Sequence, residues 1–236
     1  MDQIYKNYED ILHRINLACE RACRKAEQVN LIVVTKHQPV DRMIRVWEAG
    51  ARCFGENYPE EATLKIRELN GLIQPEWHMI GHIQSRKIKY LVEHFSWIHS
   101  IDRFDIAVKL NQAFESVHKK ISVLIEINVS SETTKFGYSI DNEEEINFLL
   151  NEIERMKELN ALELRGLMIM PPLTSNAETN RIHFQTARQL QERISSALNL
   201  PRFDQISMGT SSDFEVAIEE GATFVRIGEA ILGKRI

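Results

Sequence analysis

The sequence lacks the features of disulfide-linked and membrane-spanning proteins. Only three of its 236 residues are cysteines, at Cys19, Cys23 and Cys53, and their odd number and spacing fit no metal-finger pattern. No apolar run is long enough to cross a bilayer, and the first residues do not form an apolar signal segment. We therefore expect a soluble cytoplasmic protein that makes no contact with membranes.

The sequence also has no excess of positive charge. It contains 29 lysines and arginines against 34 aspartates and glutamates, which gives a net charge of −5. Such a chain has no general attraction for nucleic acid or for anionic membranes. Any site for an anion must therefore be built locally from a few groups.

A regular alternation of strand-like and helix-like segments runs along the whole chain. It starts with an amphipathic segment at 4–27, and most of the strand-like runs that follow are succeeded by helical sequence. We expect strands at 31–35, 51–54, 76–80, 97–100, 121–127, 162–169, 203–207 and 223–227. We expect further helices at 40–49, 59–69, 84–93, 104–118, 141–159, 176–198 and 212–221.

The eight strands and their short connections predict one domain over 1–236, a single (β/α)8 barrel of the α/β class with an extra N-terminal helix. Two helix starts carry residue pairs that resemble capping boxes, Asp141 with Glu144 and Ser212 with Glu215. An open doubly wound sheet is the alternative, but no glycine-rich dinucleotide fingerprint follows the first strand.

The loops after the last two predicted strands favour a phosphate site. In such barrels the functional face lies at the carboxyl ends of the strands, and phosphate commonly binds at loops seven and eight. Here loop seven is Ser-Met-Gly-Thr-Ser-Ser at 207–212, followed directly by a helix, and loop eight contains Gly228. Small residues let backbone N–H groups converge on an anion. Two ordinary tight turns are the alternative.

Lys36 and Arg226 lie at the same predicted face. Lys36 follows an apolar strand, so its amine enters a partly desolvated barrel mouth, as a Schiff-base lysine requires. Together with a phosphate site, this lysine points to pyridoxal phosphate. Arg226 can face the pyridine nitrogen of that cofactor and keep it unprotonated, which makes the ring a poor electron sink. The alternatives are a solvated lysine and a buried salt-bridge arginine.

His78 and His82 are spaced four apart, but they lie on a strand-to-loop segment with Gly81 between them. The helical geometry that places such a pair on one metal ion is therefore not expected. No matching cysteine or glutamate cluster is near them in the sequence, and we expect no metal site.

At these residues the sequence resembles the pyridoxal phosphate homeostasis proteins, which are fold-type III barrels similar to the N-terminal domain of alanine racemase. The matching segments, in chain order, are Val-Val-Thr-Lys-His at 33–37, Phe-Gly-Glu-Asn-Tyr at 54–58, Trp-His-Met-Ile-Gly-His-Ile-Gln at 77–84, Ile-His-Ser-Ile-Asp at 98–102, Gly-Leu-Met at 166–168, Ser-Met-Gly-Thr-Ser-Ser-Asp at 207–213 and Val-Arg-Ile-Gly at 225–228.

The resemblance implies a role for each matching site residue. Lys36 is the lysine that forms a covalent aldimine with pyridoxal 5′-phosphate, and Arg226 faces the pyridine nitrogen. Asn57 and Met168 contact the ring, and Lys135 lies near the cofactor mouth. The residues implied around the phosphate are Ser207, Gly209, Thr210, Ser211 and Gly228.

The resemblance implies a cofactor-binding homeostasis protein without a reaction of its own, with apo enzymes that use the cofactor as partners and a monomeric state. An amino-acid racemase is the alternative. A racemase needs two acid–base groups on opposite faces of the cofactor; in alanine racemases one comes partly from a second domain, for which we expect no sequence here because the chain ends at Ile236. A phosphosugar enzyme would leave Lys36 and Arg226 without a joint role.

Overall fold

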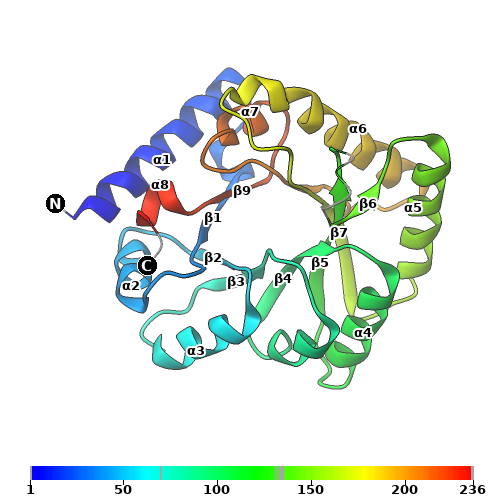
Figure 1. Ribbon diagram of the computed structural model, residues 1–236, viewed down its shortest axis with the longest axis horizontal. Helices are drawn as coiled ribbons and strands as arrows, with labels where there is room; N and C mark the ends of the chain where they lie inside the picture. Colours follow the sequence, from blue (N-terminus) through cyan, green and yellow to red (C-terminus); the bar gives the residue numbers. More distant parts are fainter. Residues whose placement is uncertain (1, 70, 131, 133–135, 235–236) are drawn as a thin grey trace.

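The computed structural model describes residues 2–69, 71–130, 132 and 136–234. Eight parallel strands form a closed barrel surrounded by helices (Figure 1). The barrel closes because β4 pairs with β5 and β1 pairs with β9. The strands are β1 Asn30–Val34, β2 Cys53–Glu56, β3 Glu76–Met79, β4 Phe95–Ile101, β5 Ile121–Asn128, β7 Leu162–Ile169, β8 Gln205–Ser207 and β9 Phe224–Ile227. The predicted fold class is confirmed.

Helices occupy the connections between the strands. The α-helices are α1 Gln3–Arg21, α2 Val40–Glu48, α3 Pro59–Leu69, α4 Phe104–Glu115, α5 Glu143–Met156, α6 Arg181–Ala197, α7 Phe214–Glu219 and α8 Glu229–Leu232. The 3-10 helices are η1 Ala26–Gln28, η2 Ser85–Tyr90 and η3 Ala177–Asn180. Within the described part of the chain, no helix is both long and apolar enough to cross a membrane.

Three details of the secondary structure differ from the expectation. A two-residue strand, β6 Tyr138–Ser139, pairs with the end of β5, and it is too short to give a periodic signal. The connection after β3 is the 3-10 helix η2 rather than an α-helix. After β9 the chain forms the short helix α8, where only a tail was expected.

Both predicted capping pairs are wrong. Helix α5 is capped by Asn142, whose side chain accepts from the Glu145 N–H at 3.0 Å, so the pair lies one residue beyond the predicted one. At α7 the N-cap residue is Asp213, and its carboxylate accepts from the Thr210 N–H at 2.7 Å instead of capping the helix. Polar residues are adjacent at both helix starts, and sequence alone does not tell which one adopts the cap conformation.

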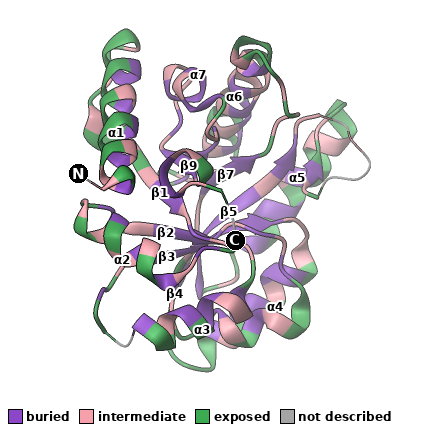
Figure 2. Cartoon of the chain, turned by 60° about the vertical axis from the view of Figure 1, so that its left-hand side comes forward, coloured by how far each residue is buried: buried purple, intermediate pink, exposed green. Residues whose placement is uncertain are grey.

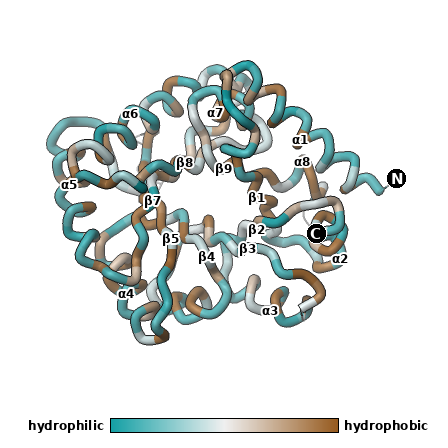
Figure 3. Tube along the Cα trace, turned by 180° about the vertical axis from the view of Figure 1, so that it is seen from behind, coloured by the Kyte–Doolittle hydropathy of each residue, from teal (hydrophilic) through white to brown (hydrophobic). Residues whose placement is uncertain are grey.

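Two separate apolar clusters lie on the two sides of the sheet. The larger one packs the outer face of the strands against the helices, and buried residues follow the strands in Figure 2. In Figure 3 hydrophobic and hydrophilic segments alternate along the peripheral helices, as amphipathic helices require. The smaller cluster consists of Ile32, Leu124, Met168 and Phe224.

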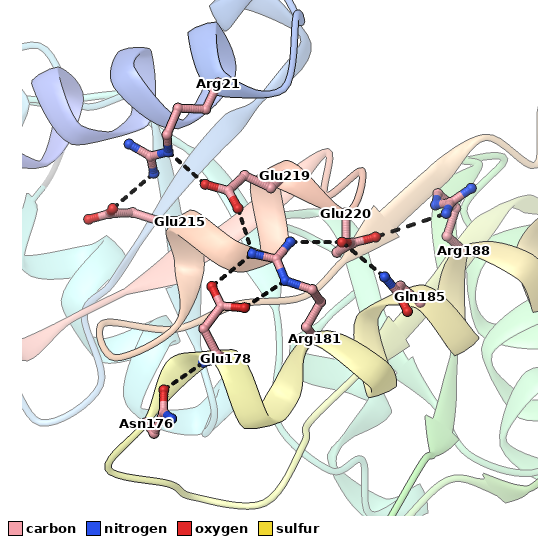
Figure 4. A network of polar contacts seen from close by, with 9 residues as sticks. All are labelled: Arg21, Asn176, Glu178, Arg181, Gln185, Arg188, Glu215, Glu219 and Glu220. Carbon is pink, nitrogen blue, oxygen red and sulfur yellow. Dashed lines mark hydrogen bonds and ion pairs between the residues drawn. The ribbon is translucent and has the colours of Figure 1, made fainter.

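Helix α7 is held on two sides by an ion-pair network (Figure 4). Arg21 of α1 contacts Glu219 at 2.7 Å and Glu215 at 3.1 Å. Arg181, at the start of α6, contacts Glu219 at 2.7 Å and Glu220 at 2.8 Å. The network therefore ties α7 to α1 on one side and to the start of α6 on the other.

Candidate functional site

A pocket of about 340 Å³ opens at the carboxyl ends of the strands. It is bounded by residues that follow β1, β2, β8 and β9, together with Arg226 inside β9. The predicted site residues that line it are Lys36, Asn57, Thr210, Ser211, Arg226 and Gly228. Val34, Ile80 and Met170 provide apolar wall. The structure therefore brings the predicted lysine, arginine and phosphate loops into one cavity.

Three other predicted residues lie beneath this pocket and do not line it. Met168 is fully buried in the smaller apolar cluster. Ser207 is also fully buried, at the end of β8. Gly209 supports the loop: its φ is +90°, and an added Cβ would lie 2.7 Å from the Ala217 Cβ. Lys135 lies outside the described residues.

The loop after β8 is fixed by its own hydrogen bonds. Asp213 accepts from the Thr210 N–H at 2.7 Å and from the Thr210 hydroxyl at 3.1 Å. The Gly209 carbonyl accepts from the Arg226 N–H at 3.0 Å, which ties the loop to β9. Since these bonds hold the backbone, Ser211 is presented to the pocket on a rigid turn.

The Arg226 side chain is held by three hydrogen bonds and keeps its positive charge. It donates to the Ser207 hydroxyl at 2.6 Å, to the Ile169 carbonyl at 2.9 Å and to the Met170 sulfur at 3.0 Å. Burial lowers the pKa of Arg226 to about 10, and the negative charges of Asp213 and Glu126 oppose that shift. At neutral pH the guanidinium is therefore a cation that can only donate hydrogen bonds.

A hydrogen-bonded row of side chains continues from Arg226 down the barrel interior. The Ser207 hydroxyl lies 2.9 Å from His99 Nδ1, and His99 Nε2 lies 3.0 Å from His78 Nδ1. His78 Nε2 in turn lies 3.4 Å from a Glu76 carboxylate oxygen. Burial lowers the pKa of both histidines, that of His99 further. Both rings are therefore neutral at pH 7 and can each donate one hydrogen bond and accept another.

A second pocket of about 440 Å³ adjoins the first and shares Asn57, Ile80 and Met170 with it. Sequence reasoning missed Glu126 in its wall. One Glu126 oxygen is buried without a hydrogen-bond partner among the described residues. Burial, followed by repulsion from Asp102, raises the pKa of Glu126 to about 7. The available signal was a single carboxylate within the apolar run of β5.

The comparisons with known proteins agree with this architecture. A family model described as alanine racemase, N-terminal domain, matches residues 7–235. The pyridoxal phosphate homeostasis protein of Vibrio alginolyticus is 38% identical over 238 residues, covering 100% of this chain and 99% of that protein. The structure of PipY from Synechococcus elongatus with PLP bound is 31% identical, with a TM-score of 0.80, and the match covers 94% of this chain and 100% of that one.

A more distant solved structure shares the fold alone. Alanine racemase of Clostridium difficile is 16% identical, with a TM-score of 0.68, and the match covers 96% of this chain and 56% of the racemase. Fold and matches together define a barrel of the alanine racemase N-terminal domain class. Within that class, the chain belongs to the pyridoxal phosphate homeostasis protein family. The resemblance drawn from the sequence is thereby confirmed.

Proposed function

We propose that the pocket between Lys36 and Arg226 binds pyridoxal 5′-phosphate and that the protein serves pyridoxal phosphate homeostasis. The observation that carries the proposal is that an amine and a buried guanidinium line one cavity together with small hydroxyl residues. The homeostasis name of the relative and the PLP bound to PipY support it. The pocket volume also lies in the range used for small ligands.

The residues present fit this cofactor group by group. Lys36 supplies the amine for a covalent bond to the cofactor's aldehyde, in a pocket whose apolar wall includes Val34 and Ile80. Ser211 and Gly228 offer hydroxyl and backbone donors for the phosphate, while both donors of Thr210 are engaged by Asp213. Asn57 lines the same pocket, and we propose that it contacts the ring.

Arg226 determines what the bound cofactor can do. When bound, the cofactor supplies an aldehyde for amines and a ring that can withdraw electrons. A charged guanidinium cannot accept a proton or a hydrogen bond, so a ring nitrogen that faces it must remain unprotonated. An unprotonated ring withdraws electrons weakly, which favours holding and delivering the cofactor over turnover of amino acids. Supply to apo enzymes, the monomeric state and the cytoplasmic location stay predictions from the sequence.

The test is chemical attachment at Lys36. The purified protein is expected to be yellow, and borohydride reduction should fix the cofactor to the peptide that contains Lys36. Lys36→Ala should lose the yellow colour, whereas Lys87→Ala, a lysine of the adjoining pocket, should keep it. Stable attachment to a different lysine in the unmutated protein would contradict the assignment.

The absence of catalysis needs its own measurement. The protein is incubated with a panel of D- and L-amino acids while chirality and keto-acid release are followed. We expect no Lys36-dependent turnover in the usual enzymic range, on the order of 1 s⁻¹ or more. Turnover at that rate, abolished in Lys36→Ala, would make the protein an enzyme.

A further inference from the structure

Three side chains of metal-binding type meet at the amino ends of β2 and β3, the end of the barrel opposite Lys36. Cys53 is the first residue of β2 and Glu76 the first of β3, and the two are paired in register. His78 lies two residues further along β3. Neither pocket at the carboxyl ends includes any of the three.

Two of the three ligand-atom spacings match those of a tetrahedral metal site. One Glu76 carboxylate oxygen lies 3.7 Å from Cys53 Sγ and 3.4 Å from His78 Nε2. All three ligand atoms lie within 4.8 Å of one another. Around a tetrahedral Zn²⁺, with bonds of about 2.0 Å to nitrogen or oxygen and about 2.3 Å to sulfur, ligand atoms are separated by roughly 3.2–3.8 Å. The cluster needs only small side-chain movements to close on an ion.

His78 provides the observation that a ligand belongs there. Its side chain is fully buried, and Nε2 has no hydrogen-bond partner of normal geometry within the described residues. A buried polar atom left in this state costs free energy, so its position needs a reason. Nε2 is directed at the other two ligand atoms, and the opposite ring nitrogen is held 3.0 Å from His99 Nε2. Metal-binding histidines are commonly oriented by such a second contact.

Glu76 is oriented by a partner of its own. The Trp97 indole N–H donates to one carboxylate oxygen at 3.1 Å, which leaves the other oxygen for the cluster. Trp97 also stacks on His78, with a ring-centroid distance of 6.0 Å and an interplanar angle of 6°. The Glu76 side chain is 44% exposed. Water can therefore reach the cluster as a fourth ligand.

We propose that Cys53, Glu76 and His78 form a binding site for a borderline-soft divalent cation of the Zn²⁺ type. A thiolate, an imidazole and a carboxylate select such ions over Mg²⁺ and Ca²⁺, which prefer all-oxygen surroundings. Three protein ligands with one place for water make an exchangeable site rather than a closed structural one. Binding replaces the thiol proton by the metal ion and releases that proton to solvent.

The sequence predicts no metal site because His78 and His82 do not share a helix face. Cys53 and Glu76 lie 23 residues apart in the chain. Only the pairing of β2 with β3 makes them neighbours. Binding should tighten as the pH rises, because metal and proton compete for the sulfur.

The probe is Co²⁺, added to the tag-free protein after dialysis against a chelator. We expect one Co²⁺ per chain, with intense tetrahedral bands in the red, a sulfur-to-metal charge-transfer band, and displacement by Zn²⁺. The expected dissociation constant is about 100 µM or tighter. Weaker binding, or none, would overturn the proposal. X-ray absorption of the Zn²⁺ form should show one sulfur ligand, and a shell without sulfur would equally overturn it.

Matched variants locate the site. Cys53→Ser should abolish the charge-transfer band, and Glu76→Gln should weaken Co²⁺ binding about tenfold or more. Cys23→Ser, at an exposed cysteine of the described chain, should leave both unchanged. A Cys53→Ser protein that gives the unmutated spectrum would show that the sulfur comes from elsewhere. Glu76→Gln keeps an acceptor for Trp97, so it remains informative if Cys53→Ser fails to fold.

Discussion

The Arg226 guanidinium donates its 2.6 Å hydrogen bond to the Ser207 hydroxyl, and this connects the candidate pocket to the two buried histidines. Arginine cannot accept, but a serine oxygen has two lone pairs, so the hydroxyl can accept from His99 Nδ1 as well as from Arg226. Metal binding at His78 Nε2 requires the tautomers in which His99 Nδ1 donates to Ser207 and His78 Nδ1 donates to His99 Nε2. Such tautomers leave the His78 Nε2 lone pair facing Glu76.

This position of Ser207 separates its role from that of Ser211. Ser207→Ala removes the acceptor of a buried cation and should lower the free energy of unfolding by about 1–3 kcal/mol. It should weaken the binding of pyridoxal and of pyridoxal phosphate by the same factor. Ser211→Ala should weaken pyridoxal phosphate alone, by about 1 kcal/mol for one hydrogen bond. The affinities of both variants for pyridoxal and for pyridoxal phosphate are measured by titration. If Ser207→Ala weakened the binding of pyridoxal phosphate alone, the Ser207 hydroxyl would contact the phosphate and the prediction would be wrong.

Glu126 should make the protein less stable as the pH rises. Its pKa is raised from 4.5 to about 7 in the folded state, so the folded protein binds more protons than the unfolded chain between these values. The free energy of unfolding should therefore fall by up to about 3 kcal/mol across that interval. Glu126→Gln should remove this loss, as measured by urea unfolding at several pH values. Glu144→Gln, at an exposed position, is the control, and an unchanged slope in Glu126→Gln would contradict the prediction.

The buried histidines should act in the opposite direction. Burial lowers the pKa of His99 well below 6.5, so the unfolded chain binds a proton that the folded protein excludes. Stability is then complete above about pH 6.5 and is lost as the pH falls. His99→Gln should reduce the loss of unfolding free energy at acidic pH, as measured by urea unfolding, whereas His13→Gln, at an exposed position, should not. The same loss at acidic pH in both variants would refute a role for His99.

Gly209 should tolerate a side chain less well than another glycine of the same helical unit. Gly209→Ala meets both a positive φ of +90° and close contacts, 2.7 Å to Ala217 and 2.9 Å to the Phe214 Cα. Gly221→Ala has φ +106° but meets only the flexible Arg188 side chain, at 3.2 Å. Gly209→Ala should lower the free energy of unfolding more and should also weaken pyridoxal phosphate binding. Gly221→Ala should lower the free energy of unfolding by only about 1 kcal/mol, through backbone strain. Equal losses in thermal unfolding would show that the contacts relax.

The fold was predictable because the barrel strands are marked by short apolar runs. Runs such as Ile121–Asn128 are buried on both faces, so their positions could be predicted within a few residues. The short strand β6 and the two helix caps could not, because they depend on which of several adjacent polar groups meets a partner in three dimensions. Local propensity does not contain that information.

The candidate site was predictable only at its rim. Lys36 and Gly228 are visible as residues that follow apolar strands, and they do line the pocket. The placement of Ser207 beneath Arg226 was not visible, because a serine at a strand end can point up to the loop or down into the barrel. Glu126 and the Cys53 cluster were missed for a related reason: burial and strand pairing, rather than sequence spacing, create them.

The pairing of β1 with β9 has a consequence for biosynthesis. Lys36 follows β1, while Arg226 lies in β9 and Gly228 directly after it, much later in the chain. A growing chain can expose the lysine long before its partners exist, but it cannot close the cavity until β9 has left the exit tunnel. Capture of an aldehyde in this pocket is therefore a property of finished molecules, and a chain released early would leave the edge of β1 open to aggregation.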